Sequence, residues 1–244
     1  MHRRHVPLRK PVIKMKKTLL TSLLLCAIFA IQSFAQDEEG YWPRAYYAGI
    51  GMGVVATRGD IGNDDNVVYK LDDGTTETVH FPALDLLAMP DFILGVNIRE
   101  FSLSANFNYW RYTEVMGGFP DESNEQGVRI YRLGIEFTYN LYWPEYFQPR
   151  IGIGYAYTNI RTNECVFPSD TDRKLTSAEL MGSSIAFILG IRYFWTDHIV
   201  LQPDLKFYEA WFGHLNTKEM GTFDLKHKKW QTFAVMEVDL IWQF

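Results

Sequence analysis

The residues best suited to acid–base chemistry are two histidines near the C-terminal end of the chain. His214 and His227 share a polar stretch with Glu209, and Ser177 lies in another polar stretch upstream. A serine hydroxyl becomes a nucleophile when a histidine takes its proton and an acid orients that histidine. These four residues are therefore candidates for the nucleophile, base and acid of an enzyme that hydrolyses or transfers acyl groups. Because no enzyme signature surrounds them, we expect no catalytic residues.

Metal binding is the second chemistry that the residue types suggest. Two stretches are rich in acids: Asp60, Asp64, Asp65, Asp72, Asp73 and Glu77 in the first, and Glu114, Asp121, Glu122 and Glu125 in the second. They could hold divalent cations or basic partners, but their spacing does not match a calcium-binding loop. We therefore expect no metal and no cofactor, and interpret these acids as solvated loop residues.

The charge of the chain is split between a basic beginning and an acidic body. Residues 1–35 hold seven Lys or Arg and no acid, which leaves 17 bases against 29 acids in the remainder, a net charge of −12. Phosphate backbones are bound by basic surfaces, so the acidic body argues against nucleic acid as a partner.

The basic beginning has the pattern of an export signal. Lys16 and Lys17 precede an apolar run that ends at Ile31, and small residues stand at Ser33 and Ala35. This order predicts a cleavable signal peptide over 1–35, with Met15 as the alternative start, followed by a periplasmic segment over 36–44. Cys26 lies in the signal peptide, so the mature chain keeps Cys165 alone and forms no internal disulfide.

The body of the chain, 45–244, alternates between apolar and polar residues. From Trp230 to Phe244 the even positions are apolar apart from Thr232, and the odd positions include Gln231, Glu237 and Asp239. The same period of two occurs in eight segments: 46–56, 91–98, 101–109, 131–141, 150–157, 184–193, 199–207 and 230–244. Because no apolar run is long enough for a spanning helix, these segments predict an all-β, eight-stranded, antiparallel, up-and-down transmembrane β-barrel.

The connections between the segments alternate in length. Short turns are expected at 99–100, 142–146 and 194–198, and long loops at 57–90, 113–128, 159–180 and 209–229. Outer-membrane barrels have short periplasmic turns and long extracellular loops. Aromatic residues near the strand ends predict two interfacial girdles, with Tyr208 and Trp230 among those on the loop side.

Charged residues occupy the face that alternation assigns to the lumen. They are four acids and four bases: Arg132, Glu136, Arg150, Arg192, Asp204, Lys206, Glu237 and Asp239. An eight-stranded barrel has room inside for little besides side chains, and unpaired charges there would be costly. We therefore expect these residues to pair across the barrel and fill it. The alternative is a polar permeation path.

Residues 44–244 resemble the OmpA/OmpX-like outer-membrane β-barrel superfamily, including porin-family and PorT-like proteins of the type IX secretion system. The resemblance rests on the signal peptide, the eight segments, the glycine-rich first segment and the terminal Trp242-Gln243-Phe244. It implies a cell outer membrane location in a Gram-negative bacterium. It also implies that Trp242 and Phe244 form the C-terminal signal read by the barrel-assembly machinery.

The function that these observations favour is that of a non-enzymatic outer-membrane barrel. Such a protein would be structural or surface-binding, or a member of an outer-membrane assembly concerned with secretion. Its expected partners are outer-membrane lipid, lipopolysaccharide, the assembly machinery, and extracellular or outer-membrane proteins that meet its loops. The alternatives are a lipid A-modifying enzyme, which would use the histidines described first, and a narrow channel.

Overall fold

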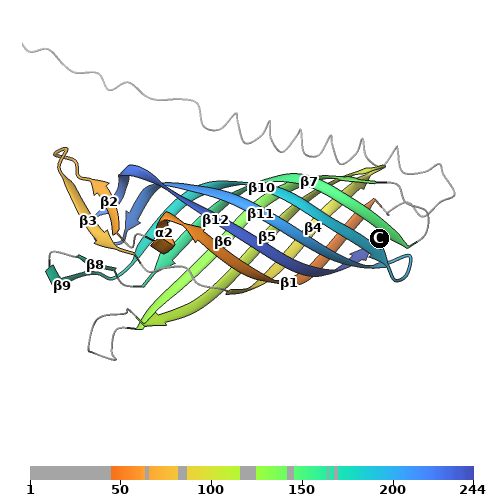
Figure 1. Ribbon diagram of the computed structural model, residues 1–244, viewed down its shortest axis with the longest axis horizontal. Helices are drawn as coiled ribbons and strands as arrows, with labels where there is room; N and C mark the ends of the chain where they lie inside the picture. Colours follow the sequence, from red (N-terminus) through yellow and green to blue (C-terminus); the bar gives the residue numbers. More distant parts are fainter. Residues whose placement is uncertain are drawn as a thin grey trace, which may run out of the picture. The chain divides into compact units, whose positions relative to one another are not determined.

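Eight long antiparallel strands close into a barrel. The computed structural model describes residues 45–63, 66–81, 87–115, 125–141, 146–163, 165–167 and 170–244. The barrel strands are β1 (Tyr46–Gly59), β4 (Leu87–Ile98), β5 (Phe101–Val115), β6 (Glu125–Asn140), β7 (Phe147–Thr162), β10 (Ala178–Phe194), β11 (Ile199–Thr217) and β12 (Gly221–Gln243). Each pairs with the next, and β12 pairs with β1 from Tyr47↔Gln243 to Gly59↔Gln231 (Figure 1). The predicted eight-stranded, up-and-down barrel is confirmed.

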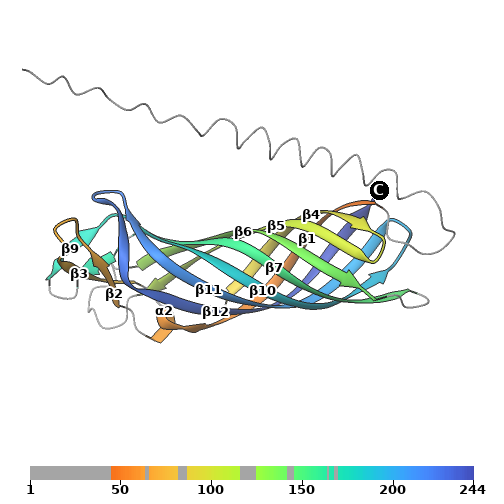
Figure 2. The ribbon, with the colours of Figure 1, turned by 90° about the horizontal axis from the view of Figure 1, so that it is seen from above.

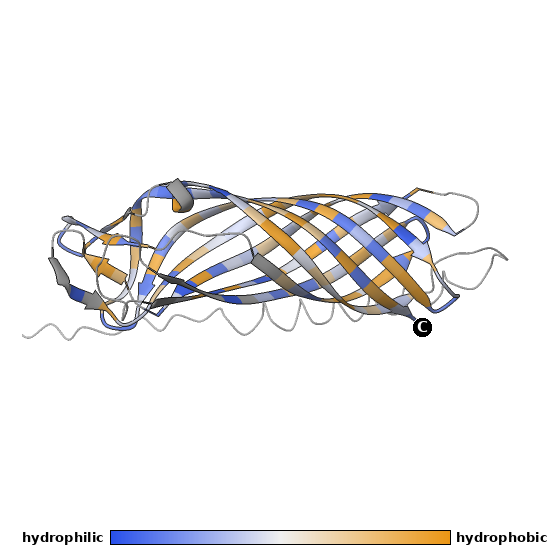
Figure 3. Ribbon diagram, turned by 60° about the horizontal axis from the view of Figure 1, so that its bottom comes forward, coloured by the Kyte–Doolittle hydropathy of each residue, from blue (hydrophilic) through white to orange (hydrophobic). Residues whose placement is uncertain are grey.

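The outer wall of the barrel is apolar. Along β12, Met236 is 69% exposed and points outward, whereas its neighbour Val235 is fully buried in the lumen. The same alternation on the other strands produces the mixed colours along each ribbon in Figure 3. A closed sheet leaves no backbone edge without a hydrogen-bond partner, and an apolar exterior suits contact with lipid tails. Among the described residues, no helix has the length and hydropathy needed to cross a membrane.

Both ends of the barrel sequence lie at the end with short turns. The backbone N–H of Phe244 donates to the carbonyl of Tyr46, and β4 and β5 meet at the turn Arg99-Glu100. Arg99 adopts a left-handed backbone conformation with φ 54°. A turn of two residues favours such positive φ values because they match the twist of the flanking strands.

One predicted loop is wrong. The segment 209–229 is not a long loop, because β11 continues to Thr217, β12 begins at Gly221, and only three residues separate them. The two strands stay paired beyond the apolar wall, with a register shift between Phe212 and His214. Outside lipid a paired strand does not need an apolar face, so the alternation stops although the hydrogen-bonded ladder continues.

The other long connections contain further structure. The first holds α2 (Asp60–Asn63), β2 (Asn66–Lys70) and β3 (Thr76–His80), and the third holds β8 (Cys165–Phe167) and β9 (Asp170–Leu175). The hairpins β2–β3 and β8–β9 lie at the end of the barrel opposite the C-terminus (Figures 1 and 2). We call these elements, together with the β11–β12 tip over 213–228, the cap.

The cap is packed on an apolar core of its own that continues into the barrel. Val67, Val79, Phe81 and Phe167 are almost completely buried in one cluster with barrel residues such as Ile130. Leu225 of β12 pairs with Tyr69 of β2, so the first hairpin joins the edge of the extended β11–β12 ladder. The mouth of the barrel is therefore covered by folded structure.

Candidate functional site

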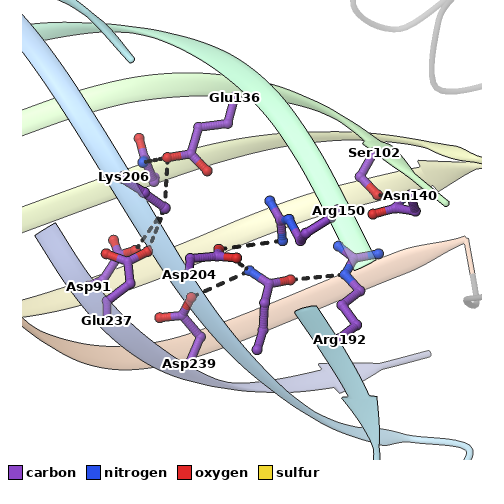
Figure 4. Close-up of polar contacts among 12 residues, drawn as sticks. Asp91, Ser102, Glu136, Asn140, Arg150, Arg192, Asp204, Lys206, Glu237 and Asp239 are labelled. Atoms are coloured by element: carbon purple, nitrogen blue, oxygen red, sulfur yellow. Dashed lines mark hydrogen bonds and ion pairs between the residues drawn. The ribbon is translucent and has the colours of Figure 1, made fainter. Parts of the chain in front are cut away.

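The centre of the lumen is organised around Lys206. Its ammonium group lies 2.8 Å from a carboxylate oxygen of Glu136, 2.5 Å from one of Glu237 and 3.9 Å from one of Asp91. These residues come from β11, β6, β12 and β4, so the contact joins strands across the barrel (Figure 4). Lys206 is fully buried. One cation thus compensates carboxylates from three other strands.

A second group of contacts lies nearer the short-turn end. Arg150 faces Asp204 at 3.6 Å, and the side-chain amide of Gln202 donates to Asp204 at 2.9 Å. Arg192 donates to Gln202 at 2.9 Å and to Asn97 at 2.8 Å. A more distant contact, 3.4 Å, connects Gln202 to Asp239. This group therefore connects two amides, two arginines and two acids, and Figure 4 shows the two arginines and the two acids.

The guanidinium group of Arg132 contacts neutral side chains instead of carboxylates. It donates twice to the side-chain oxygen of Asn108, at 3.0 and 2.9 Å, and its guanidinium lies 3.5 Å from the centre of the Tyr208 ring. The hydroxyl of Tyr208 donates to Glu136 at 3.1 Å. The prediction that Tyr208 belongs to the outer aromatic girdle is therefore wrong, because its neighbours Phe207 and Glu209 take the outward positions.

All eight lumen residues selected from the sequence are buried, each less than 4% exposed. The predicted balance of four acids and four bases is nevertheless wrong, because Asp91 is also in the lumen and 1% exposed. The sequence pattern indicates this inward position, because Asp91 lies between outward Pro90 and outward Phe92. Among the lumen side chains that the structure describes, five acids thus face four bases, and two of those bases, Arg132 and Arg192, contact neutral partners.

Three of the carboxylates are close enough to share a metal ion. Asp91, Glu237 and Asp239 each place an oxygen within 4.8 Å of the others. Carboxylate oxygens are ligands that Ca²⁺ and Mg²⁺ prefer. The ammonium of Lys206 already lies against two of the three residues. The cation of this cluster is therefore a side chain of the protein, and we assign no metal to it.

Two glycines make room for the acids. A Cβ atom on Gly51 would lie 1.7 Å from an oxygen of Asp239, and one on Gly190 would lie 1.7 Å from an oxygen of Asp204. These distances are far below van der Waals contact. The glycines at these two inward positions are what allow carboxylates on the neighbouring strands to lie over the backbone.

The charged residues lie between two apolar groups. Along β12 the inward side chains run Phe233, Val235, Glu237, Asp239 and Ile241. Phe233 and Val235 belong to the cluster that continues into the cap, and Ile241 belongs to a second cluster on the short-turn side. The described lumen is thus filled by side chains at three successive levels.

The residues of the catalytic hypothesis are not brought together. His214 lies 2.8 Å from Asp224, and Glu209 accepts a hydrogen bond from Thr232. Ser177 directly precedes Ala178, which pairs with Thr217, three residues beyond His214. That offset corresponds to about 10 Å along a strand. The fourth candidate, His227, is exposed on the cap.

The C-terminal aromatic residues face outward. Trp242 is 53% exposed and stacks on His198 with 5.5 Å between ring centres, and Phe244 is 56% exposed and stacks on Tyr46. Their role as a signal for the assembly machinery stays a prediction. The predicted signal peptide over 1–35, its alternative start at Met15 and the segment 36–44 lie outside the described residues.

Cys165 lies inside the cap and is fully buried. Burial raises the pKa of its thiol far above the ordinary value because the charged thiolate is poorly solvated there. Because the thiolate is the nucleophilic form, a thiol buried in this way is expected to react slowly.

Comparison with known proteins shows a shared fold. No family model and no curated protein matches the chain. The outer membrane protein OprG from Pseudomonas aeruginosa aligns with a TM-score of 0.54 and 15% identity, over 85% of this chain and 99% of that one. Neisserial surface protein A aligns with a TM-score of 0.47 and 10% identity, over 82% and 97%. The outer membrane protease OmpT from Escherichia coli aligns with a TM-score of 0.41 and 9% identity, over 83% and 97%.

The likeness to OprG concerns architecture, and a fold of this kind does not by itself separate enzymes from binding proteins. The closed ladder of eight antiparallel strands is the part of the architecture that the alignment with OprG supports. The chain has an eight-stranded antiparallel β-barrel fold, which it shares with the outer membrane protein OprG.

Proposed function

We propose that this protein is a non-enzymatic, non-conducting integral protein of the outer membrane that presents its cap to partners outside the cell. The observation that carries the proposal is the filling of the lumen. Buried charged residues at Lys206 and Arg192 lie between an apolar cluster that continues into the cap and a second apolar cluster on the short-turn side. A barrel filled in this way has little use as a passage, which leaves the cap as the part that contacts partners.

The cap has the properties of a preformed binding surface. Glu77 of β3 and Arg173 of β9 form an ion pair at 2.7 Å, and the hydroxyl of Tyr69 donates to Glu77 at 2.6 Å. Asp60 of α2 accepts from the backbone N–H of Trp230 at 2.8 Å. These contacts connect both hairpins and α2 to one another or to the barrel. Loops that are ordered before binding lose less entropy on binding.

The proposed partners follow from the three surfaces of the molecule. The apolar wall contacts outer-membrane lipid and lipopolysaccharide. Trp242 and Phe244 lie exposed at the end of the last strand, where the barrel-assembly machinery would read them. The cap meets extracellular proteins or other members of an outer-membrane assembly, and a secretion complex is one such assembly.

Photocrosslinking in the native outer membrane tests this proposal. A photoreactive amino acid at Asp72 or Lys218, both exposed on the cap, should give adducts with protein. The same amino acid at Leu133, which is 59% exposed on the apolar wall, serves as the matched control and should give adducts with lipid alone. Protein adducts of equal yield at all three positions, or none at the cap, would contradict a binding role for the cap.

The absence of catalysis is tested on the lipid itself. Mass spectrometry of lipid A from cells with and without the gene should give identical spectra. A change in acyl chains or phosphate groups that depends on the gene, and that is lost in a His214→Ala variant, would overturn the proposal in favour of an enzyme.

A further inference from the structure

Three arginines lie side by side on the outer wall of the barrel. Arg111 of β5 is paired in register with Arg129 of β6, and Arg129 is paired with Arg161 of β7. All three occupy outward positions, because each lies an even number of residues from an exposed side chain on its own strand. These exposed side chains are Tyr109 on β5, Leu133 on β6 and Tyr157 on β7. Directly opposite residues on one face of a sheet have Cβ atoms about 5 Å apart. We call these residues the arginine row.

The arginine row lies just beyond the lipid-facing surface. Tyr109, Tyr131 and Tyr157 stand before it on the same three strands, and the apolar wall continues from them toward the short turns. Tyrosines at the margin of an apolar wall mark the level of lipid headgroups. The row is on the side of the cap, which is the outer leaflet if the protein sits as proposed above.

The charge of the row is not balanced by the described side chains. Glu179 of β10 lies 3.3 Å from Arg161 and is the acid paired with it in register. The Nε of Arg129 is buried and has no hydrogen-bond partner in the described part of the chain. Like charges directly opposite one another on a sheet are destabilising. One carboxylate for three guanidinium groups leaves a gap that an anion would fill.

We propose that the arginine row binds a phosphate group of an outer-leaflet lipid. A guanidinium fork matches the oxygens of a phosphate, and charge-assisted hydrogen bonds to it are the stronger kind. The adjacent apolar wall would hold the acyl chains of the same molecule. This inference rests on the proposed location in the outer membrane, and it adds the site and the chemical group by which the protein holds that lipid.

The test measures lipid retention by the purified full-length barrel in phosphatidylcholine vesicles. The probes are lipid A, lipid A from which the phosphates have been removed, and inorganic phosphate. Lipid A should bind more tightly than its dephosphorylated form, and Arg129→Gln should weaken lipid A binding about tenfold, the loss of one charge-assisted contact. Arg129→Lys should recover part of that loss, because it keeps the charge without the fork.

A matched control lies on the opposite side of the barrel. Lys226 and Lys228 are exposed on β12 at the cap end, and Lys228→Gln removes the same charge from the same side of the membrane. Equal loss of binding in Lys228→Gln and Arg129→Gln would overturn the proposal in favour of general cationic attraction. Equal binding of both lipid A forms, or full competition by inorganic phosphate, would also overturn it.

The failure of this site and the failure of the proposed function are distinguishable. The vesicle experiment does not depend on where the protein resides in the cell, whereas fractionation of cell envelopes measures the location alone. Heat-modifiable gel migration of each variant confirms that it has folded before its binding is compared.

Discussion

Replacement of Lys206 by methionine should destabilise the barrel by about 3–5 kcal/mol, the usual cost of removing one partner from a buried ion pair. The ammonium lies 2.8 and 2.5 Å from carboxylates of Glu136 and Glu237. With an effective dielectric constant of about 20, each contact corresponds to about 6 kcal/mol of attraction. Burial of the ammonium group costs several kcal/mol in return, so the net loss is smaller than the sum of the attractions.

The measurement is guanidinium-induced unfolding of the barrel in lipid vesicles, followed by tryptophan fluorescence and by heat-modifiable gel migration. Asp239→Asn is the matched control, because it also removes one buried charge but relieves the excess of acids over bases. We expect this variant to be as stable as the original protein or more so. If Lys206→Met were within 1 kcal/mol of the original protein, or Asp239→Asn were equally destabilised, the idea of a charge-compensated lumen would be refuted.

Two further predictions concern the cap. Hydrogen bonds from Arg173 and Tyr69 hold the pKa of Glu77 below its ordinary value, so this contact stabilises the cap above pH 4.5 and is lost as the pH falls through the lowered pKa. The protection of the β2–β3 amides against hydrogen exchange, relative to the intrinsic rate at each pH, should therefore fall at acid pH, and Glu77→Gln should remove that dependence. Cys165 should react with a maleimide about a hundredfold more slowly than an exposed cysteine, because the buried thiol reacts only when the cap opens. The comparison protein carries Thr75→Cys at an exposed position together with Cys165→Ser. Similar rates of the two thiols would contradict a packed cap.

The sequence was most informative where lipid constrains it. Within the membrane nearly all outward positions are apolar, so a period of two revealed eight strands and assigned Glu237 and Asp239 to the lumen. Outside lipid that constraint is absent, and the pattern therefore missed the extension of β11 and β12 and the two hairpins of the cap. Tyr208 was predicted on the outer wall because tyrosines are common at membrane interfaces, but its place in the alternation, between outward Phe207 and Glu209, puts it in the lumen. Asp91 likewise lies in the lumen, as its place in the alternation between outward and inward residues requires.

The pairing of the lumen residues could not be predicted from the sequence. Lys206 meets Glu136, 70 positions away, because the barrel closes with a particular register between β11, β12 and β1. That register depends on the tilt and stagger of all eight strands together. A list of inward charges determines which partners exist but not which of them come into contact. Arg132, for example, contacts neutral Asn108 and Tyr208, which the list of inward charges could not indicate.

Conductance of the purified barrel in a planar lipid bilayer tests the central claim of a filled lumen most directly. Ion passage requires a continuous aqueous path, and the described lumen is occupied by an apolar cluster, a charged network and a second apolar cluster in succession. We predict no discrete current steps, both for the complete protein and for a variant in which a short linker replaces the β2–β3 hairpin. Reproducible single-channel steps in the complete protein would contradict the account.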